Sequence, residues 1–111
     1  METGDINKSG PQDWIPITDK LQLAVLGKLG EELCEGGSAI FRSIIQGLNS
    51  KEPKTSKINR HWIEDEIADI RAMLDHAEHY LDLDTDTINQ RQKAKYDFKA
   101  PWFAKLFRGE I

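Results

Sequence analysis

Apolar residues recur every three or four positions along two long stretches of this 111-residue chain, which is the spacing of an amphipathic helix. The first stretch begins at Thr18 or Asp19, either of which can cap a helix N-terminus, and runs to about Leu48. Its apolar stripe holds Val25, Leu26, Leu29, Leu33, Ile40 and Ile44. The second stretch begins at Asn59 as its cap, runs to about Leu81, and has a stripe of Ile63, Ile67, Ile70, Leu74, Ala77 and Leu81. We therefore expect two long antiparallel helices.

The rest of the chain predicts shorter or irregular structure. Gly36-Gly37 is expected to weaken or kink the first helix, and residues 47–57 read as a loop because they contain Gly, Asn, Ser and Pro53. Asp84-Thr85 opens a shorter helix through about Phe98, and Pro101 stops it. Residues 1–13 are expected to form a flexible tail. Because no segment alternates like a strand, the predicted class is all-α, a helical bundle with residues 1–111 as one domain.

Composition excludes several classes of function. A formal charge of -4, from 15 Lys+Arg and 19 Asp+Glu, makes a broad nucleic-acid-binding face a poor expectation. The single cysteine excludes an intrachain disulfide and a multi-cysteine zinc site. No apolar run approaches the roughly 18 residues that span a bilayer, and the polar N-terminus lacks a signal-peptide stretch, so we expect no membrane partner and a cytoplasmic location.

Charge is unevenly distributed along the chain. Residues 61–86 carry 1 basic and 9 acidic groups, whereas residues 51–60 carry 4 basic and 1 acidic and residues 87–111 carry 6 basic and 2 acidic. A strongly acidic segment thus lies between two basic ones. Solvated helix faces are the common explanation of such a pattern, and a cation site beside an anion site is the alternative.

Two acidic pairs stand out on the predicted long helices. Glu32 and Glu35 on the first, and Glu66 and Asp69 on the second, are each three residues apart and share a helix face. At about 100° per residue, both pairs flank their apolar stripes on the same rotational side, so antiparallel packing brings the four carboxylates together. Solvated surface acids remain the alternative. A divalent cation would compensate the repulsion, and oxygen-only ligands favour Mg²⁺ or Mn²⁺.

The acidic pattern resembles that of the MazG-like, all-α nucleoside triphosphate pyrophosphohydrolases, in particular their short phage-type members. The matching residues run from Gly27 to Glu35 (an EExxE motif) and from Asn59-Arg60 to Asp69 (an ExxD motif), within a resemblance covering roughly residues 20–96. It implies hydrolysis of a (d)NTP to the (d)NMP and pyrophosphate, and a homodimer or homotetramer. It also implies metal ligation by Glu32, Glu35, Glu66 and Asp69, with Glu31 as the extra acid of the first motif.

Within that activity, a nearby carboxylate, Glu35 or Glu31, would take a proton from the attacking water. Basic groups would contact the phosphates, and the candidates are Lys57, Arg60, Arg91, Lys93 and Lys95. Trp14 and Trp62 could stack on the base, although aromatic residues more often fill cores or interfaces. Some phage relatives convert dGTP to dGMP for a base-modified genome, which would place this chain in the host cytoplasm.

A non-catalytic helical interaction module is the alternative function. It is favoured by the apolar stripes and by the apolar end-piece that begins at Trp102. Either function predicts a homo-oligomer, because a small monomer has limited means to cover its large apolar side chains. Those that argue most for it are Ile40, Phe41, Ile44, Trp102, Phe103 and Phe107.

Overall fold

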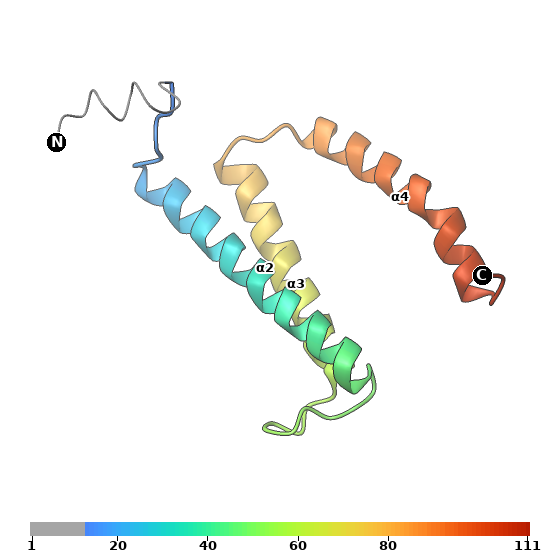
Figure 1. Ribbon diagram of the computed structural model, residues 1–111. Helices are drawn as coiled ribbons and strands as arrows, with labels where there is room; N and C mark the ends of the chain where they lie inside the picture. The colour runs from blue at the N-terminus through green and yellow to red at the C-terminus, as the bar shows by residue number, and fades with distance from the viewer. Residues whose placement is uncertain (1–12) are drawn as a thin grey trace.

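The computed structural model describes residues 13–111, and within them all regular structure is helical. The helices are α2 (Lys20–Gln46), α3 (Asn59–Tyr80) and α4 (Thr85–Phe107) (Figure 1). The described residues contain no strand, only an isolated bridge between Lys51 and Ile58 in the α2–α3 loop. The all-α prediction is therefore confirmed. The predicted tail lies outside the described residues except for Asp13.

An aspartate side chain caps two of the three described helices. The Asp19 side chain accepts a hydrogen bond from the Gln22 backbone N–H, and Asp84 does the same for Thr87. Asn59, in contrast, is not a cap. Ile58 occupies the cap position of α3 without a side-chain hydrogen bond, because the Asn59 side chain is buried against the end of α2 instead.

The predicted end of the third helix before Pro101 is wrong, whereas the predicted continuity of the first helix is confirmed. Helix α2 continues through Gly36 and Gly37, and α4 continues through Pro101 to Phe107. A proline inside a helix removes a single backbone N–H donor, while the turns on either side keep their own hydrogen bonds. The third helix is therefore as long as the second, with 23 residues against 22.

Helices α2 and α3 pack antiparallel along their length (Figure 1). The residues that they bury or half-bury against each other are spaced alternately by four and three positions, as in a coiled coil. We call this contact the seam. On α2 it comprises Val25, Leu29, Glu32, Gly36, Ala39 and Ser43. On α3 it comprises Asn59, Ile63, Glu66, Ile70, Met73 and Ala77.

The seam corrects the predicted apolar stripe of α2, which is rotated away from the real contact, whereas Ile63, Ile70 and Ala77 of the α3 stripe do lie in the seam. Of the six stripe residues on α2, only Val25 is buried and Leu29 half-buried, and the other four are exposed. Two stripe residues of α3 are exposed as well. At about 100° per residue, all six exposed side chains fall on one side of the helix pair. We call this surface the outer apolar face: Leu26, Leu33, Ile40, Ile44, Ile67 and Leu74.

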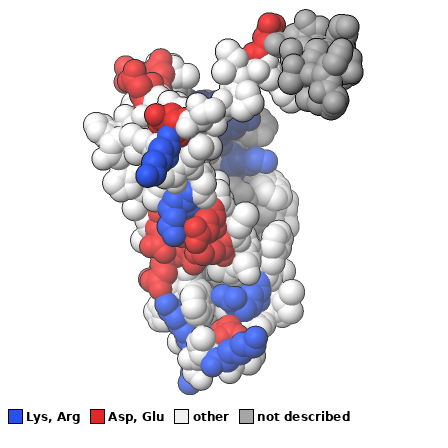
Figure 2. Space-filling view, turned by 90° about the vertical axis from the view of Figure 1, so that its left-hand side faces the viewer, with Lys and Arg blue, Asp and Glu red and all other residues white. Residues whose placement is uncertain are grey.

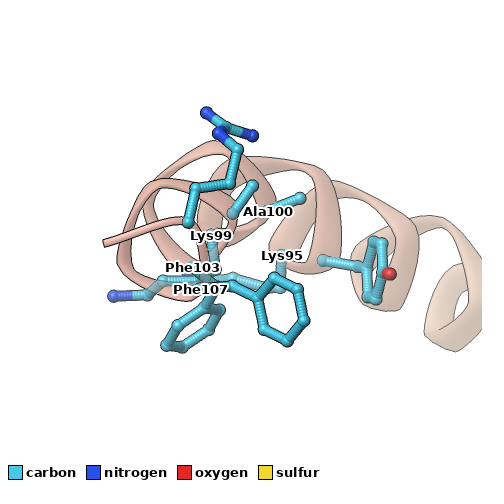
Figure 3. Close-up of a pocket in the computed structure, with 8 residues that line it drawn as sticks. Lys95, Lys99, Ala100, Phe103 and Phe107 are labelled. Carbon is cyan, nitrogen blue, oxygen red and sulfur yellow. The ribbon is translucent and has the colours of Figure 1, made fainter. Parts of the chain in front are cut away.

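Helix α4 stands apart from the α2–α3 pair (Figure 1), and the seam is the one extensive contact among the three described helices. The radius of gyration is 19.7 Å, whereas a compact domain of this length has about 13 Å. The last turns of α4 leave Phe103 and Phe107 exposed on one side of the helix (Figure 3). They line a surface hollow of about 950 Å³ with Lys95, Tyr96, Lys99, Ala100, Ala104 and Arg108. None of the described helices has the length and apolarity to cross a lipid bilayer.

Gly36 lies where the two helices approach each other closely. A Cβ atom at this position would lie 2.8 Å from Ile70 Cδ1, so that side chain would have to move. A Cβ on Gly27, which also lies within α2, would meet no atom within 4 Å. We expect Gly27→Ala to stabilise the protein by about 1 kcal/mol through helix propensity. Gly36→Ala should gain less, and Gly36→Leu should lose about 1–3 kcal/mol through overpacking.

Urea unfolding of the three variants, with helix content followed by circular dichroism, measures these differences. Equal stability of Gly27→Ala and Gly36→Ala would show that the seam does not need a glycine.

Candidate metal centre

Three carboxylates from two helices meet beside the seam. Glu32 and Glu35 on α2 and Glu66 on α3 each offer an oxygen atom, and these three atoms lie within 4.8 Å of one another. The predicted convergence of the two acidic pairs is thus confirmed for these three residues. A compact acidic area, with basic side chains nearby, is visible on one face of the molecule (Figure 2).

Seam geometry explains this arrangement. Glu32 and Glu66 occupy seam positions, so their side chains start between the helices. Glu35 and Asp69 follow three residues later on each helix, which places both on the same flank of the antiparallel pair. Asp69 is exposed and outside the group of three, but its charge helps to raise the pKa of both Glu32 and Glu66.

Burial is the largest cause of the altered titration of the two seam carboxylates. It raises the pKa of Glu32 and of Glu66 above the ordinary value of 4.5, and the negative charge of Glu35 raises both further. Lys28 opposes the rise at Glu32, and Lys57 opposes it at Glu66. The Oε2 atoms of Glu32 and Glu66 are buried without a hydrogen-bond partner among the described residues. Buried polar atoms are rarely left so, and these two oxygens are free to accept a ligand.

The donor set suits a hard divalent cation. Carboxylate oxygens without nitrogen or sulfur are typical of Mg²⁺ and Mn²⁺ sites. Around one octahedral Mg²⁺, neighbouring ligand oxygens lie about 3 Å apart and opposite ones about 4.2 Å apart. The three oxygens within 4.8 Å therefore need only a small closing movement, which the exposed Glu35 side chain can supply.

A lysine that the sequence patterns did not single out lies next to this cluster. Lys28 Nζ is 3.3 Å from Glu31 Oε2 and 3.9 Å from Glu32 Oε1. Glu31 is exposed and forms an ion pair with Lys28, and it is not one of the three clustered carboxylates. Lys28 precedes Glu31 and Glu32 by three and four residues, and this spacing was the available signal.

A cleft of about 230 Å³ adjoins the carboxylates. Glu35, Ser38, Ala39 and Arg42 of α2 line it together with Trp62 and Glu66 of α3. Ser38 and Arg42 were not among the sequence candidates. They follow Glu35 by three and seven residues, a spacing that keeps all three side chains on one face of α2.

The predicted substrate-binding residues are only partly brought together. Trp62 lines the cleft, and Lys57 Nζ lies 4.4 Å from the centre of its ring while also pairing with Asp65. Arg60 is exposed, and its Nε atom donates to Asn49 Oδ1 at 2.9 Å in the α2–α3 loop.

The other four candidates lie outside the cleft of their own chain. Trp14 is 76% exposed beside other N-terminal residues. The other three candidates, Arg91, Lys93 and Lys95, lie on helix α4, which makes no extensive contact with the helix pair. Lys93 pairs with Asp97 one turn further along α4.

No protein-family model, curated protein or solved structure matches the chain. Its function is therefore inferred from the chemistry of the carboxylates, the cleft and the surfaces around them.

Stability without metal should fall as the pH rises above about 4.5. Because the folded state raises the pKa of Glu32 and Glu66, it binds more protons than the unfolded state between the ordinary and the raised values. The free energy of unfolding must then decrease with pH across that window, and the loss persists at neutral pH. Thermal melts in chelator from pH 4.5 to 7.5 measure the trend.

Glu32→Gln removes one of the two titrations and should flatten the profile. A variant profile parallel to that of the wild type would contradict the pKa assignment.

Proposed function

We propose that this protein is a metal-dependent nucleoside triphosphate pyrophosphohydrolase, which converts a (d)NTP and water to the (d)NMP and pyrophosphate. The observation that carries the proposal is the meeting of Glu32, Glu35 and Glu66 at the seam, where two buried carboxylate oxygens have no hydrogen-bond partner within residues 13–111. The EExxE and ExxD motifs that supply these residues are the ones in which the chain resembles MazG-like enzymes. Conversion of dGTP to dGMP in a phage nucleotide pathway, in the host cytoplasm, is the specific case we favour.

Glu32, Glu35 and Glu66, with Asp69 at the edge, are the residues that would hold Mg²⁺ or Mn²⁺. A divalent cation at this place supplies charge neutralisation for the triphosphate and a lower pKa for a bound water. Glu35 is the better placed of the two candidate bases, since Glu31 is engaged by Lys28. Its carboxylate also lines the cleft, which gives it access to a water molecule beside a bound substrate.

The reaction needs one displacement at phosphorus. The water oxygen attacks the α-phosphorus, and the bond from that phosphorus to the oxygen bridging to the β-phosphorus breaks. Pyrophosphate leaves with the electron pair of that bond, and the water proton passes to the carboxylate. Lys57, beside Trp62 and close enough to Glu66 to influence its pKa, is the predicted cation best placed to contact the phosphates.

We further propose that the chain assembles with itself, as a homodimer or homotetramer. The outer apolar face lies on the side of the helix pair opposite to the acidic flank, so an assembly through it leaves the carboxylates accessible. Helix α4 adds a second uncovered apolar surface, at Trp102, Phe103 and Phe107. Contiguous exposed apolar surfaces of this kind mark interaction sites. The same surfaces would serve a non-catalytic interaction module, which is the alternative function.

Removing one ligand should abolish activity and spare the fold. We expect Glu32→Gln and Asp69→Asn to lose pyrophosphate release with every nucleotide in a panel of NTPs and dNTPs containing Mg²⁺ or Mn²⁺. Each change removes a negative charge from a repelling group, so stability without metal should stay equal or rise. Glu64→Gln is the matched control, because Glu64 is an exposed acid of α3 that is bonded to His61.

Either metal should also raise the melting temperature of the wild type and leave Glu32→Gln almost unmoved. Wild-type activity in either ligand variant would contradict the metal site. A wild-type melting temperature insensitive to both metals, with no turnover of any nucleotide, would favour the interaction module.

Assembly should depend on the outer apolar face. Light scattering at micromolar concentration should return a mass of two or four chains, each of 12.7 kDa. Ile40→Lys places a charge within the face and should shift the mass towards one chain. Ile45→Lys is the control, because Ile45 is also exposed on α2 but points away from the face at about 100° per residue. A wild-type mass of one chain would refute the proposed assembly.

A further inference from the structure

Arg42 has an unusual position for an arginine next to carboxylates. It lines the same cleft as Glu35 and Glu66, yet among residues 13–111 it forms no ion pair. The cation and the carboxylates thus face a common space without neutralising each other. A ligand that carries negative charge towards Arg42 and a bound cation towards the carboxylates would satisfy both.

Two neighbouring side chains hold the guanidinium of Arg42 in place. Its Nε atom donates to Asn59 Oδ1 at 3.2 Å, and its Cζ atom lies over the Trp62 ring, 5.3 Å from the ring centre. Asn59 is fully buried, and its amide nitrogen donates to Gln46 Oε1 at 3.1 Å and to the Gly47 carbonyl at 3.0 Å. The anchor of Arg42 is therefore the rigid junction between the end of α2 and the start of α3.

The hydrogen bond to Asn59 uses the Nε–H donor of Arg42 and leaves the N–H donors of the two terminal nitrogens available. Arginine has five N–H donors, and the four on its terminal nitrogens form the planar pattern that binds two phosphate oxygens at once. Because Nε alone is taken by Asn59, the described residues leave the terminal donors for a ligand. The hydrogen bond to Asn59 and the cation–π contact with Trp62 limit the side chain's freedom, so less conformational entropy is lost when an anion binds.

The spacing along α2 indicates how long the anion is. Arg42 follows Glu35 by seven residues, which corresponds to about 10.5 Å along the helix axis. This separation of the two backbone positions favours an extended anion over a compact one. An anion of two or three linked phosphates, lying along the cleft parallel to α2, reaches both the guanidinium and a cation held by the carboxylates.

We infer that Arg42 is the substrate-binding residue for the polyphosphate chain, and that Asn59 and Trp62 hold its guanidinium in place. The ligand class is a linear polyphosphate complexed with a divalent cation. The inference rests on the proposed function for the bound cation, but the residue that it concerns, Arg42, lies outside the two acidic motifs.

Binding of inorganic tripolyphosphate tests the role of Arg42 without requiring turnover. Isothermal titration calorimetry with Mg²⁺ present should show Arg42→Gln binding tripolyphosphate roughly 10- to 100-fold more weakly than the wild type. Arg42→Lys should recover part of the loss, because it restores the charge without the fork. Affinity for Mg²⁺ alone should be unchanged in both variants. Arg108→Gln is the control, since it removes the same charge at the far end of α4.

The outcomes separate this inference from the proposed function. If wild type and Arg42→Gln bind Mg²⁺ equally and also bind tripolyphosphate equally, Arg42 has no role in binding and the inference is overturned. If the wild type binds no Mg²⁺, the metal centre fails first, and the inference fails with it. A circular dichroism spectrum and melting temperature matching the wild type establish that Arg42→Gln is folded in either comparison.

Discussion

The close antiparallel contact of α2 and α3 depends on small side chains, with Gly36, Ala39 and Ala77 buried in the seam. Glu32 and Glu66 occupy seam positions where a coiled coil normally places apolar side chains. Each of these glutamates keeps a buried oxygen to which no described residue donates a hydrogen bond, and burial raises the pKa of both. The packing that holds the helices together therefore also disfavours their ionised carboxylates, and a bound cation would remove that penalty.

The sequence predicts the helices and the carboxylate cluster well, because both depend on local spacing. It misplaces the contact face of α2, because the prediction followed the large apolar residues, whereas smaller residues form most of the buried contact. Leu33 and Ile40 are exposed, whereas Gly36 and Ala39 are buried. Glu32 and Glu35 still meet Glu66, since both helices are rotated from the predicted stripes in the same sense. When both helices of an antiparallel pair are rotated in the same sense, the flanks that carry the acidic residues still lie next to each other.

Other errors come from contacts that lie far apart in the sequence. Asn59 has the side chain of a helix cap, but its amide is used by Arg42, Gln46 and Gly47, 12 to 17 residues earlier. No local pattern reports such a contact. The prediction for Pro101 followed the average behaviour of proline, whereas α4 absorbs the loss of one donor over 23 residues. The predicted phosphate contacts of α4 assumed that it packs on the helix pair, and within one chain it does not.

The distribution of charge around the cleft shows why Arg42 matters to the whole arrangement. Lys28 and Lys57 approach the carboxylates and oppose their raised pKa values, but both also have other carboxylate partners at the surface. Arg42 is held by the neutral Asn59 and Trp62 and forms no ion pair among the described residues, although its charge helps to lower the pKa of Glu52. A site with mutually repelling acids at the seam and a guanidinium without an ion pair in the adjoining cleft, among the described residues, is complementary to a ligand of mixed charge. A divalent cation bound to a polyphosphate has that character, and neither a simple metal ion nor a simple anion does.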